Sequence, residues 1–291
     1  MDQLADRLME ALTGAMLKEI SVTPKPGLVD RSPMSAHRDM DFFSFVCSSA
    51  AIAPFFRRIF LLPALYEGEE DMALFGRARE LGKQAESWML EATKGVNTQK
   101  GIIFLGGLLA LSAGLLSSER LPWSEEALRR RMTELSAGFS GELERGAGQT
   151  HGEILFQRYR ARGIRGEVED GLPCVFEIGL PVLQRSLQEG NPFNQAGLEA
   201  LLSIMAHCED TTVLWRHGPR VLREVQRLAA AYLERGGIGA DPQLNHLVAL
   251  DRHFSRRGIS PGGAADLLFL TFSLQALVTV EAPLRLETAS N

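Results

Sequence analysis

The sequence predicts an all-α fold. Apolar residues recur at helical spacing along most of the 291 residues, as Leu4, Leu8, Leu12 and Met16 illustrate. Alternating runs rich in Val, Ile and Thr, which are typical of strands, are absent from the sequence. The longest uncharged stretch, 101–116, contains glycines and is shorter than the roughly 20 apolar residues that span a bilayer. We therefore expect about ten helices, with 101–116 buried in the core and no membrane span.

Helix start and stop signals punctuate this pattern. Asp41 precedes an apolar helix, and Ser124 precedes a first turn that contains two glutamates. Gly236 follows the apolar periodicity of 221–232 and is expected to close that helix. Ser260 and the proline after it predict the start of a last helix, which we expect to run from Gly262 to about Val278.

Composition limits the function. The formal net charge of −5 gives no overall attraction for nucleic acid or anionic lipid, so an anionic substrate needs local basic groups. Cys47, Cys174 and Cys208 lie far apart, which argues against a zinc site and a disulfide framework and suits a reducing cytoplasm. The N-terminus lacks the basic start and apolar core of a signal peptide. We expect one compact cytoplasmic domain over residues 1–291.

Residues 21–41 contain three prolines, a glycine and several charged residues between two apolar helices. Proline and glycine fix the backbone direction, so the polar groups of such a loop are free to face a ligand. Lys25, His37, Asp39 and Asp41 are the candidates. The alternative is a loop whose last aspartate caps the following helix.

Two further clusters are candidate sites. Asn97 and Lys100 precede the buried helix of 101–116, where free N–H groups and a lysine favour an anion, although a solvated helix start would look the same. Arg165 and Glu167 lie among glycines, which predicts a backbone close to a ligand, but they equally fit surface charges on a turn.

The turn of Ser260, Gly262 and Gly263 leaves backbone N–H groups open, as in a phosphate seat, or else allows a close contact between helices. Asp210 lies in an otherwise apolar helical pattern. Such a carboxylate is either hydrated on the outer face or directed inward as a metal ligand, and the pattern alone does not choose.

Six blocks together resemble the triphosphoribosyl-dephospho-coenzyme A synthase family, in matching order over roughly residues 10–280. The blocks are Pro-Lys-Pro-Gly-Leu-Val-Asp (24–30), Ala-His-Arg-Asp-Met-Asp (36–41), Gly-Val-Asn-Thr-Gln-Lys-Gly (95–101), Gly-Ile-Arg-Gly-Glu (163–167), Asp-Thr-Thr (210–212) and Ser-Pro-Gly-Gly-Ala-Ala-Asp-Leu-Leu (260–268).

The resemblance implies an all-helical transferase. The family joins the 2′-hydroxyl of 3′-dephospho-coenzyme A to C1 of the ribose of ATP and expels adenine. The product is the prosthetic-group precursor for the acyl carrier protein of citrate lyase or malonate decarboxylase. Carboxylates would stabilise the oxocarbenium-like transition state, and Mg²⁺ with basic groups would hold the triphosphate.

The resemblance also implies roles for single residues. The expected Mg²⁺ ligands are Asp39, Asp41 and Asp210, with Asp39 or Asp41 as the alternative base and Glu167 as a further catalytic carboxylate. The expected phosphate ligands are Lys25, Lys100, Arg165 and the turn of Ser260, Gly262 and Gly263. His37 is expected to assist proton transfer, and Asn97 to bind adenine or ribose.

Four positions depart from the family pattern. Gln99 stands where the family often has His, Ser35 where it has Gly, Thr212 where it has Asn, and residues 216–218 read Arg-His-Gly in place of Arg-Gly-Gly.

Two alternative functions stay open: a Mg²⁺-dependent hydrolase of a nucleotide or ADP-ribose-like substrate, and a non-catalytic helical relative that binds partner proteins. The carrier-protein pathway enzymes are candidate partners, and a homo-oligomer is left open.

Overall fold

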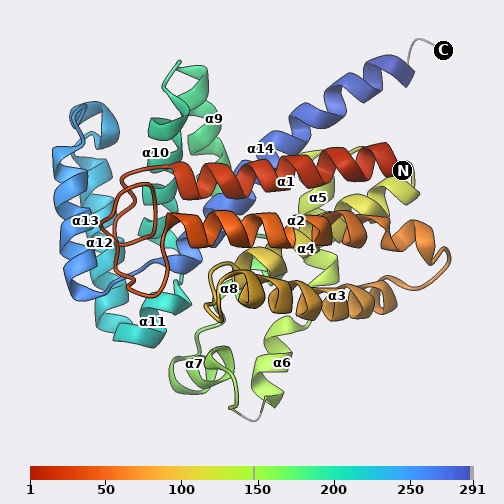
Figure 1. The fold of residues 1–291 in the computed structure, drawn as a ribbon, viewed down its shortest axis with the longest axis horizontal. Helices are drawn as coiled ribbons and strands as arrows, with labels where there is room; N and C mark the ends of the chain where they lie inside the picture. The colour runs from red at the N-terminus through yellow and green to blue at the C-terminus, as the bar shows by residue number, and fades with distance from the viewer. Residues whose placement is uncertain (147, 289–291) are drawn as a thin grey trace. The chain divides into compact units, whose positions relative to one another are not determined.

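The protein is described by a computed structural model that covers residues 1–146 and 148–288 (Figure 1). The described residues form helices and loops without a strand, which confirms the predicted all-α class. The α-helices are α1 (Asp2–Ser21), α2 (Phe42–Leu65), α3 (Asp71–Ala92), α4 (Lys100–Ser118), α5 (Glu125–Leu135), α6 (Phe139–Arg145), α7 (His151–Tyr159), α8 (Gly163–Glu169), α9 (Leu180–Gln188), α10 (Phe193–His207), α11 (Thr211–His217), α12 (Pro219–Glu234), α13 (Asn245–Arg257) and α14 (Gly262–Thr288). A π-helix, η1 (Cys174–Gly179), and a 3₁₀ helix, η2 (Gly237–Ala240), complete the set.

The helices outnumber the predicted ten because several are short. The cluster around Arg165 and Glu167, for which a turn was one interpretation, contains α8. The pattern around Asp210 was expected to lie inside one helix, but α10 ends at His207 and α11 begins at Thr211, with Asp210 between them. The last helix continues to Thr288, beyond the predicted end at Val278, and no glycine follows Val278 to end it.

The predicted helix signals are otherwise confirmed. The Ser124 hydroxyl accepts the Ala127 N–H at 3.1 Å at the start of α5. Gly236 follows α12 with a left-handed φ of +100°, the conformation that commonly ends a helix.

Contacts divide the chain into two units. Unit 1 contains residues 1–18, 43–135 and 272–291, and unit 2 contains residues 19–42 and 136–271. Each unit draws on stretches that are distant in sequence. The expectation of a single domain over 1–291 stays a prediction.

The core of unit 1 is built around α4, the helix predicted to be buried. A Cβ on Gly114 of α4 would overlap the main chain of Phe60 in α2, so the two helices approach closely here. Helices α2 and α4 are each long and apolar enough to cross a membrane, and 78% of the apolar window of α4 is buried in the structure. Core helices share this length and composition, so the two features are weak evidence for a membrane span.

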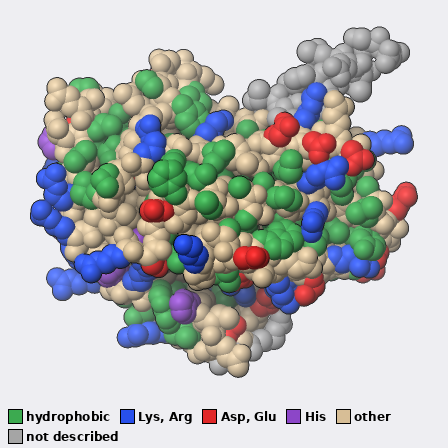
Figure 2. Space-filling model, in the orientation of Figure 1, with side chains coloured by type: hydrophobic (Ala, Val, Ile, Leu, Met, Phe, Trp, Pro, Cys, Tyr) green, Lys and Arg blue, Asp and Glu red, His purple; other side chains and the backbone are tan. Residues whose placement is uncertain are grey.

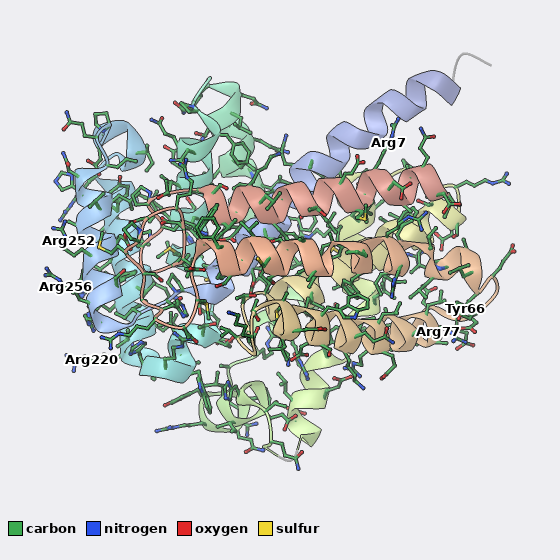
Figure 3. The ribbon with its side chains drawn as sticks, viewed as in Figure 1. Arg7, Tyr66, Arg77, Arg220, Arg252 and Arg256 are labelled. Carbon is green, nitrogen blue, oxygen red and sulfur yellow. The ribbon has the colours of Figure 1, made fainter. Side chains whose placement is uncertain are left out.

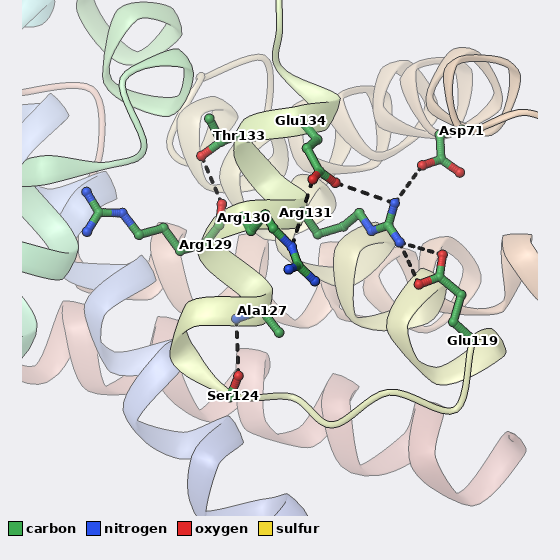
Figure 4. A network of polar contacts seen from close by, with 9 residues as sticks. All are labelled: Asp71, Glu119, Ser124, Ala127, Arg129, Arg130, Arg131, Thr133 and Glu134. Carbon is green, nitrogen blue, oxygen red and sulfur yellow. Dashed lines mark hydrogen bonds and ion pairs between the residues drawn. The ribbon is translucent and has the colours of Figure 1, made fainter.

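Polar contacts join the helices of unit 1 at their ends. Figure 4 shows Arg131 of α5 reaching Asp71 at the start of α3, at 2.9 Å, and Glu119 after the end of α4. Figure 1 shows α1 and α2 side by side, where Arg57 of α2 binds Asp2 and Asp6 of α1.

Unit 2 is organised around α10, which packs against η1, α9 and α12. The apolar face of α10 is almost entirely buried. Helices α12 and α13 follow each other across η2, and Glu224 of α12 binds Arg257 and His253 of α13. Unit 2 contains most of the residues that the sequence singled out.

Candidate functional site

The loop of residues 22–41 folds onto the junction between α13 and α14. The Gly27 N–H donates to Asp251 Oδ1 at 2.9 Å. Gly27 has a φ of +72°, and a Cβ there would overlap the Ile259 carbonyl oxygen. Only glycine fits this position without strain, so the Pro-Lys-Pro-Gly segment is anchored where α13 ends.

A buried carboxylate organises the same loop. Asp30 accepts the Thr23 hydroxyl and the Lys25 N–H, each at 2.8 Å, and the Ser32 N–H at 2.6 Å. Asp30 is 1% exposed. Asp30 was not among the predicted site residues, although it is the last residue of the block of 24–30.

The loop brings His37 to the start of α14. His37 Nε2 lies 2.8 Å from Ser260 Oγ, and Nδ1 lies 3.7 Å from Asp39 Oδ1. The Ser260 side chain is buried, whereas that of Asp39 is 64% exposed. Burial and the nearby Arg216 guanidinium lower the pKa of His37, against the opposing effect of Asp39. The lowered pKa favours the neutral imidazole, which can accept a proton.

Asp210 joins the N-termini of α11 and α14. Its Oδ1 accepts the N–H groups of Thr212 and Val213 at 2.9 and 3.0 Å, and its Oδ2 accepts the Ala264 N–H at 2.9 Å. A Cβ on Gly263 would lie 3.2 Å from this carboxylate, so the glycine makes room for it. Burial raises the pKa of Asp210, and the backbone donors oppose that rise.

The predicted phosphate seat at Ser260–Gly263 therefore already faces an anion. The open N–H groups of α14 do bind a carboxylate, as a helix N-terminus should, but it is the protein's own Asp210. The same donors occupy the oxygens of Asp210. This geometry favours a structural role for Asp210 over the metal role suggested by the resemblance.

The glycine-rich block around α8 contacts the same region. The Gly163 N–H donates to Glu209 Oε1 at 2.8 Å, one residue before Asp210. A Cβ on Gly163 would overlap the side chain of Thr211. The close approach expected at these glycines is thus to another part of the chain.

The two charged residues of that block both have protein partners. Arg165 Nη1 lies 3.4 Å from Glu142 Oε2. Glu167 Oε1 accepts the Cys174 N–H at 2.6 Å, and burial raises the pKa of Glu167.

Lys25 is 1% exposed and does not extend from the loop. Its Nζ forms an ion pair with the Glu19 carboxylate and also donates to the Glu19 carbonyl at 2.8 Å. Burial raises the pKa of Glu19, and Lys25 opposes that rise. The phosphate role of Lys25 stays a prediction, which this buried ion pair does not favour.

Asn97 and Lys100 lie in unit 1. The Asn97 side chain accepts the Lys100 N–H at 3.2 Å, and Lys100 Nζ lies 2.5 Å from Glu86 Oε1. Gln99, which departs from the family pattern, is buried and donates to the Ser49 hydroxyl at 3.1 Å. This geometry is that of a helix start.

Within the described residues, no group of three or more His, Cys, Asp or Glu side chains is arranged to hold a metal ion. Asp39 is exposed, and Asp41 is exposed where it directly precedes α2. These two carboxylates are accessible to a metal that arrives with a substrate. The residues that the structure describes do not form a ready metal centre.

Sequence reasoning did not assign a role to Asp266. It is half-buried in the second turn of α14, on the face that carries Gly262 and Gly263. Burial and the carboxylates of Glu19 and Asp210 raise the pKa of Asp266 well above its usual value. Its position inside the block of 260–268 was the sequence signal that could have identified Asp266 as a site residue.

Comparisons with known proteins agree with the resemblance. The model of the ATP:dephospho-CoA triphosphoribosyl transferase family matches residues 5–283. A Klebsiella pneumoniae protein named 2-(5''-triphosphoribosyl)-3'-dephosphocoenzyme-A synthase is 38% identical over 275 residues, which cover 94% of this chain and 91% of that protein.

Two further relatives match over most of this chain. A probable 2-(5''-triphosphoribosyl)-3'-dephosphocoenzyme-A synthase of Vibrio cholerae is 37% identical over 91% of this chain and 86% of its own length. Protein CitXG of Leuconostoc mesenteroides is 35% identical over 92% of this chain and 58% of its own length. No solved structure matches. The blocks gathered at the loop, α11 and α14 fall within the matched residues, and the chain belongs to the ATP:dephospho-CoA triphosphoribosyl transferase family.

Proposed function

We propose that this chain joins the triphosphoribosyl group of ATP to the 2′-hydroxyl of 3′-dephospho-CoA and releases adenine. The family match over residues 5–283 supports this transfer and favours it over nucleotide hydrolysis and over a non-catalytic role. The contact between His37 and Ser260 carries the mechanistic part of the proposal, because it presents a neutral imidazole at the start of α14.

In this mechanism, Nε2–H of His37 donates to Ser260, which leaves the lone pair of Nδ1 free as the base. Nδ1 takes the proton of the 2′-hydroxyl while the hydroxyl oxygen attacks C1 of the ribose. The bond from C1 to adenine breaks, and adenine receives a proton from Asp266. Asp39, 3.7 Å from Nδ1, stabilises the imidazolium that forms.

Mg²⁺ enters this proposal as part of the substrate, Mg·ATP. Asp39 and Asp41 are the exposed carboxylates of the loop and would contact the metal.

We place the reaction in the cytoplasm, in the synthesis of the citrate lyase prosthetic group, with malonate decarboxylase as the alternative recipient. The enzymes that carry this group to the acyl carrier protein are the expected partners.

The test is to incubate the protein with ATP, Mg²⁺ and 3′-dephospho-CoA, and to measure free adenine and the mass of the coupled product. Coenzyme A is the control, because its 3′-phosphate crowds the 2′-hydroxyl. Ribose triphosphate in place of the coupled product would favour the hydrolase. The absence of both adenine release and ATP binding would favour the non-catalytic relative.

A further inference from the structure

Unit 2 exposes a group of arginines without ion-pair partners. They lie on α11, α12 and α13 and are Arg216, Arg220, Arg223, Arg227, Arg252 and Arg256. None of them forms a hydrogen bond or ion pair with another described residue. Figure 2 shows Lys and Arg side chains gathered along the margin where Figure 1 draws α12 and α13. The protein as a whole has a net charge of −5, so this local excess of positive charge is unusual.

Five of these arginines lie on one side of a helix pair. Glu224, early in α12, binds His253 and Arg257, late in α13, so the two helices run antiparallel. At about 100° per residue, the three arginines of α12 lie roughly 40° to 100° round the helix from Glu224.

The arginines of α13 are rotated away from the contact with Glu224 in the same direction as the arginines of α12. Arg252 and Arg256 lie roughly 80° to 120° round α13 from its contact with Glu224. Because the helices are antiparallel, equal rotations turn both rows toward the same side. Figure 3 agrees, since Arg220, Arg252 and Arg256 extend from one margin of the molecule. We call the five arginines of α12 and α13, together with Arg216, the arginine strip.

One end of the arginine strip lies beside the candidate site. His217 Nε2 lies 2.9 Å from the Gly258 carbonyl oxygen and joins the end of α11 to the end of α13. Arg216, Arg220 and Arg256 are each within four residues of this contact, and Ser260 follows Gly258 by two residues. The charge of Arg216 reaches His37, since it lowers the pKa of that imidazole. The strip therefore leads away from His37 and Ser260 along α12 and α13.

The cations that the sequence assigned to phosphate are neutralised. Lys25 pairs with Glu19, Lys100 with Glu86, and Arg165 with Glu142. A cation that is paired with a carboxylate attracts a polyphosphate weakly, because the net charge of the pair is zero. The unpaired arginines of the strip are the stronger source of attraction in unit 2.

We propose that the arginine strip attracts the polyphosphate groups of the nucleotide substrates and steers them to the site beside His37 and Ser260. The inference rests on the proposed function, because the phosphates are those of ATP and 3′-dephospho-CoA. An excess of one charge beside a site raises association rates by roughly 10-fold to 1,000-fold, and salt screens the effect. An exposed row of arginines needs no pocket to act in this way, because the attraction is long-range.

The test compares two charge-matched double variants. Arg220→Gln with Arg256→Gln removes two charges from the strip, and Arg185→Gln with Arg235→Gln removes two exposed charges of the same unit outside it. Association and dissociation rates of a fluorescent N-methylanthraniloyl ATP are measured by stopped flow at about 20 and about 300 mM ionic strength. We expect the strip variant to associate about fivefold more slowly at low ionic strength and to approach the wild-type rate at high ionic strength. The control variant should follow the wild type at both.

Equal association rates for the strip and control variants at low ionic strength would overturn the inference. Adenine release by the wild-type protein is measured in parallel. If the strip variant slows nucleotide association but no coupled product forms, the proposed function is contradicted and the inference about the arginine strip is supported. If the product forms and association is unchanged, the inference about the arginine strip is contradicted and the proposed function is supported.

Discussion

His37 and Ser260, 223 positions apart in the sequence, meet through Nε2 and Oγ at 2.8 Å. The contact joins the proline-rich loop to the first turn of α14. It holds one ring nitrogen and leaves the other beside Asp39. The pH dependence of the reaction should therefore report the environment of this one imidazole.

The first prediction concerns Arg216. Its guanidinium lowers the pKa of His37, so Arg216→Gln should raise that pKa toward the usual value of about 6.5. A base is active above its pKa, so the acid limb of the pH profile of kcat/KM should move to higher pH. Adenine release between about pH 5 and 8 measures this shift. An acid limb that stays in place would show that His37 is not the titrating base.

The second prediction concerns the carboxylates of the loop. Asp39→Asn should abolish adenine release, because the imidazolium would lose its nearest carboxylate and Mg·ATP an accessible ligand. The Asp39 side chain is 64% exposed, so the urea unfolding midpoint should be unchanged. Asp41→Asn is the companion variant, with the same expected loss. Full activity in either variant would remove that residue from the site.

The third prediction concerns Gly27. Gly27→Ala would need both a left-handed φ and displacement of the Ile259 carbonyl, so we expect a loss of about 3 kcal/mol or more in the free energy of unfolding. Gly68→Ala is the matched control, because Gly68 also has a positive φ, +85°, but a Cβ there meets nothing within 4 Å. That control should lose only about 1 kcal/mol. Equal losses in urea unfolding would mean that the loop is not anchored at α13.

The fourth prediction concerns Asp251, which is 1% exposed and whose Oδ2 has no hydrogen-bond partner among the residues that the structure describes. Burial raises the pKa of Asp251 to about 6, from 3.8 in the unfolded chain. Below pH 3.8 the carboxyl is protonated in both states. As pH rises through the window from 3.8 to about 6, ionisation is easier in the unfolded state, so the folded state loses stability, by about 3 kcal/mol in total.

Asp251→Asn removes this titration while keeping an oxygen for the Gly27 N–H. Its stability relative to the wild type should therefore rise between about pH 4 and pH 7, as measured by urea unfolding at several pH values. A constant difference between the two proteins across that range would contradict the assignment.

The fifth prediction concerns the cysteines. Cys47 is exposed, whereas Cys174 and Cys208 are buried. Burial raises the pKa of Cys174 to about 12 and that of Cys208 well above its usual value. Iodoacetamide at about pH 8 should therefore label Cys47 alone in the native protein, and all three cysteines after unfolding. Rapid native labelling of Cys174 would show that this part of unit 2 opens.

Local features of the fold were predictable from the sequence. The start of α5 after Ser124 and the end of α12 before Gly236 depend on side chains and φ angles within a few residues. The buried character of α4 follows from its composition. Short helices such as α8 were missed because seven residues give too little periodicity to separate a helix from a turn.

Ion pairing was not predictable, because it depends on which side chains the folded backbone directs toward each other. Lys25 was expected to face phosphate, but nothing in the sequence shows that Glu19 lies beside it in the buried interior. The first turn of α14 was predicted to hold phosphate, which stays a prediction, and the sequence could not show that the Asp210 carboxylate accepts an N–H of this turn. The importance of Arg216 rests on its electrostatic effect on His37 of the loop, and only the fold brings the two charges near each other.

The division of the chain into units has a consequence for its synthesis. Unit 2 needs residues 19–42 to meet residues up to 271, and unit 1 needs residues from 272 onward. A growing chain on the ribosome therefore completes neither unit until almost all of it has emerged. Helices α1 and α2 can pack on each other and on α4 early, but unit 1 is complete only when the residues after 271 have been made, and such contacts between distant stretches favour slow folding.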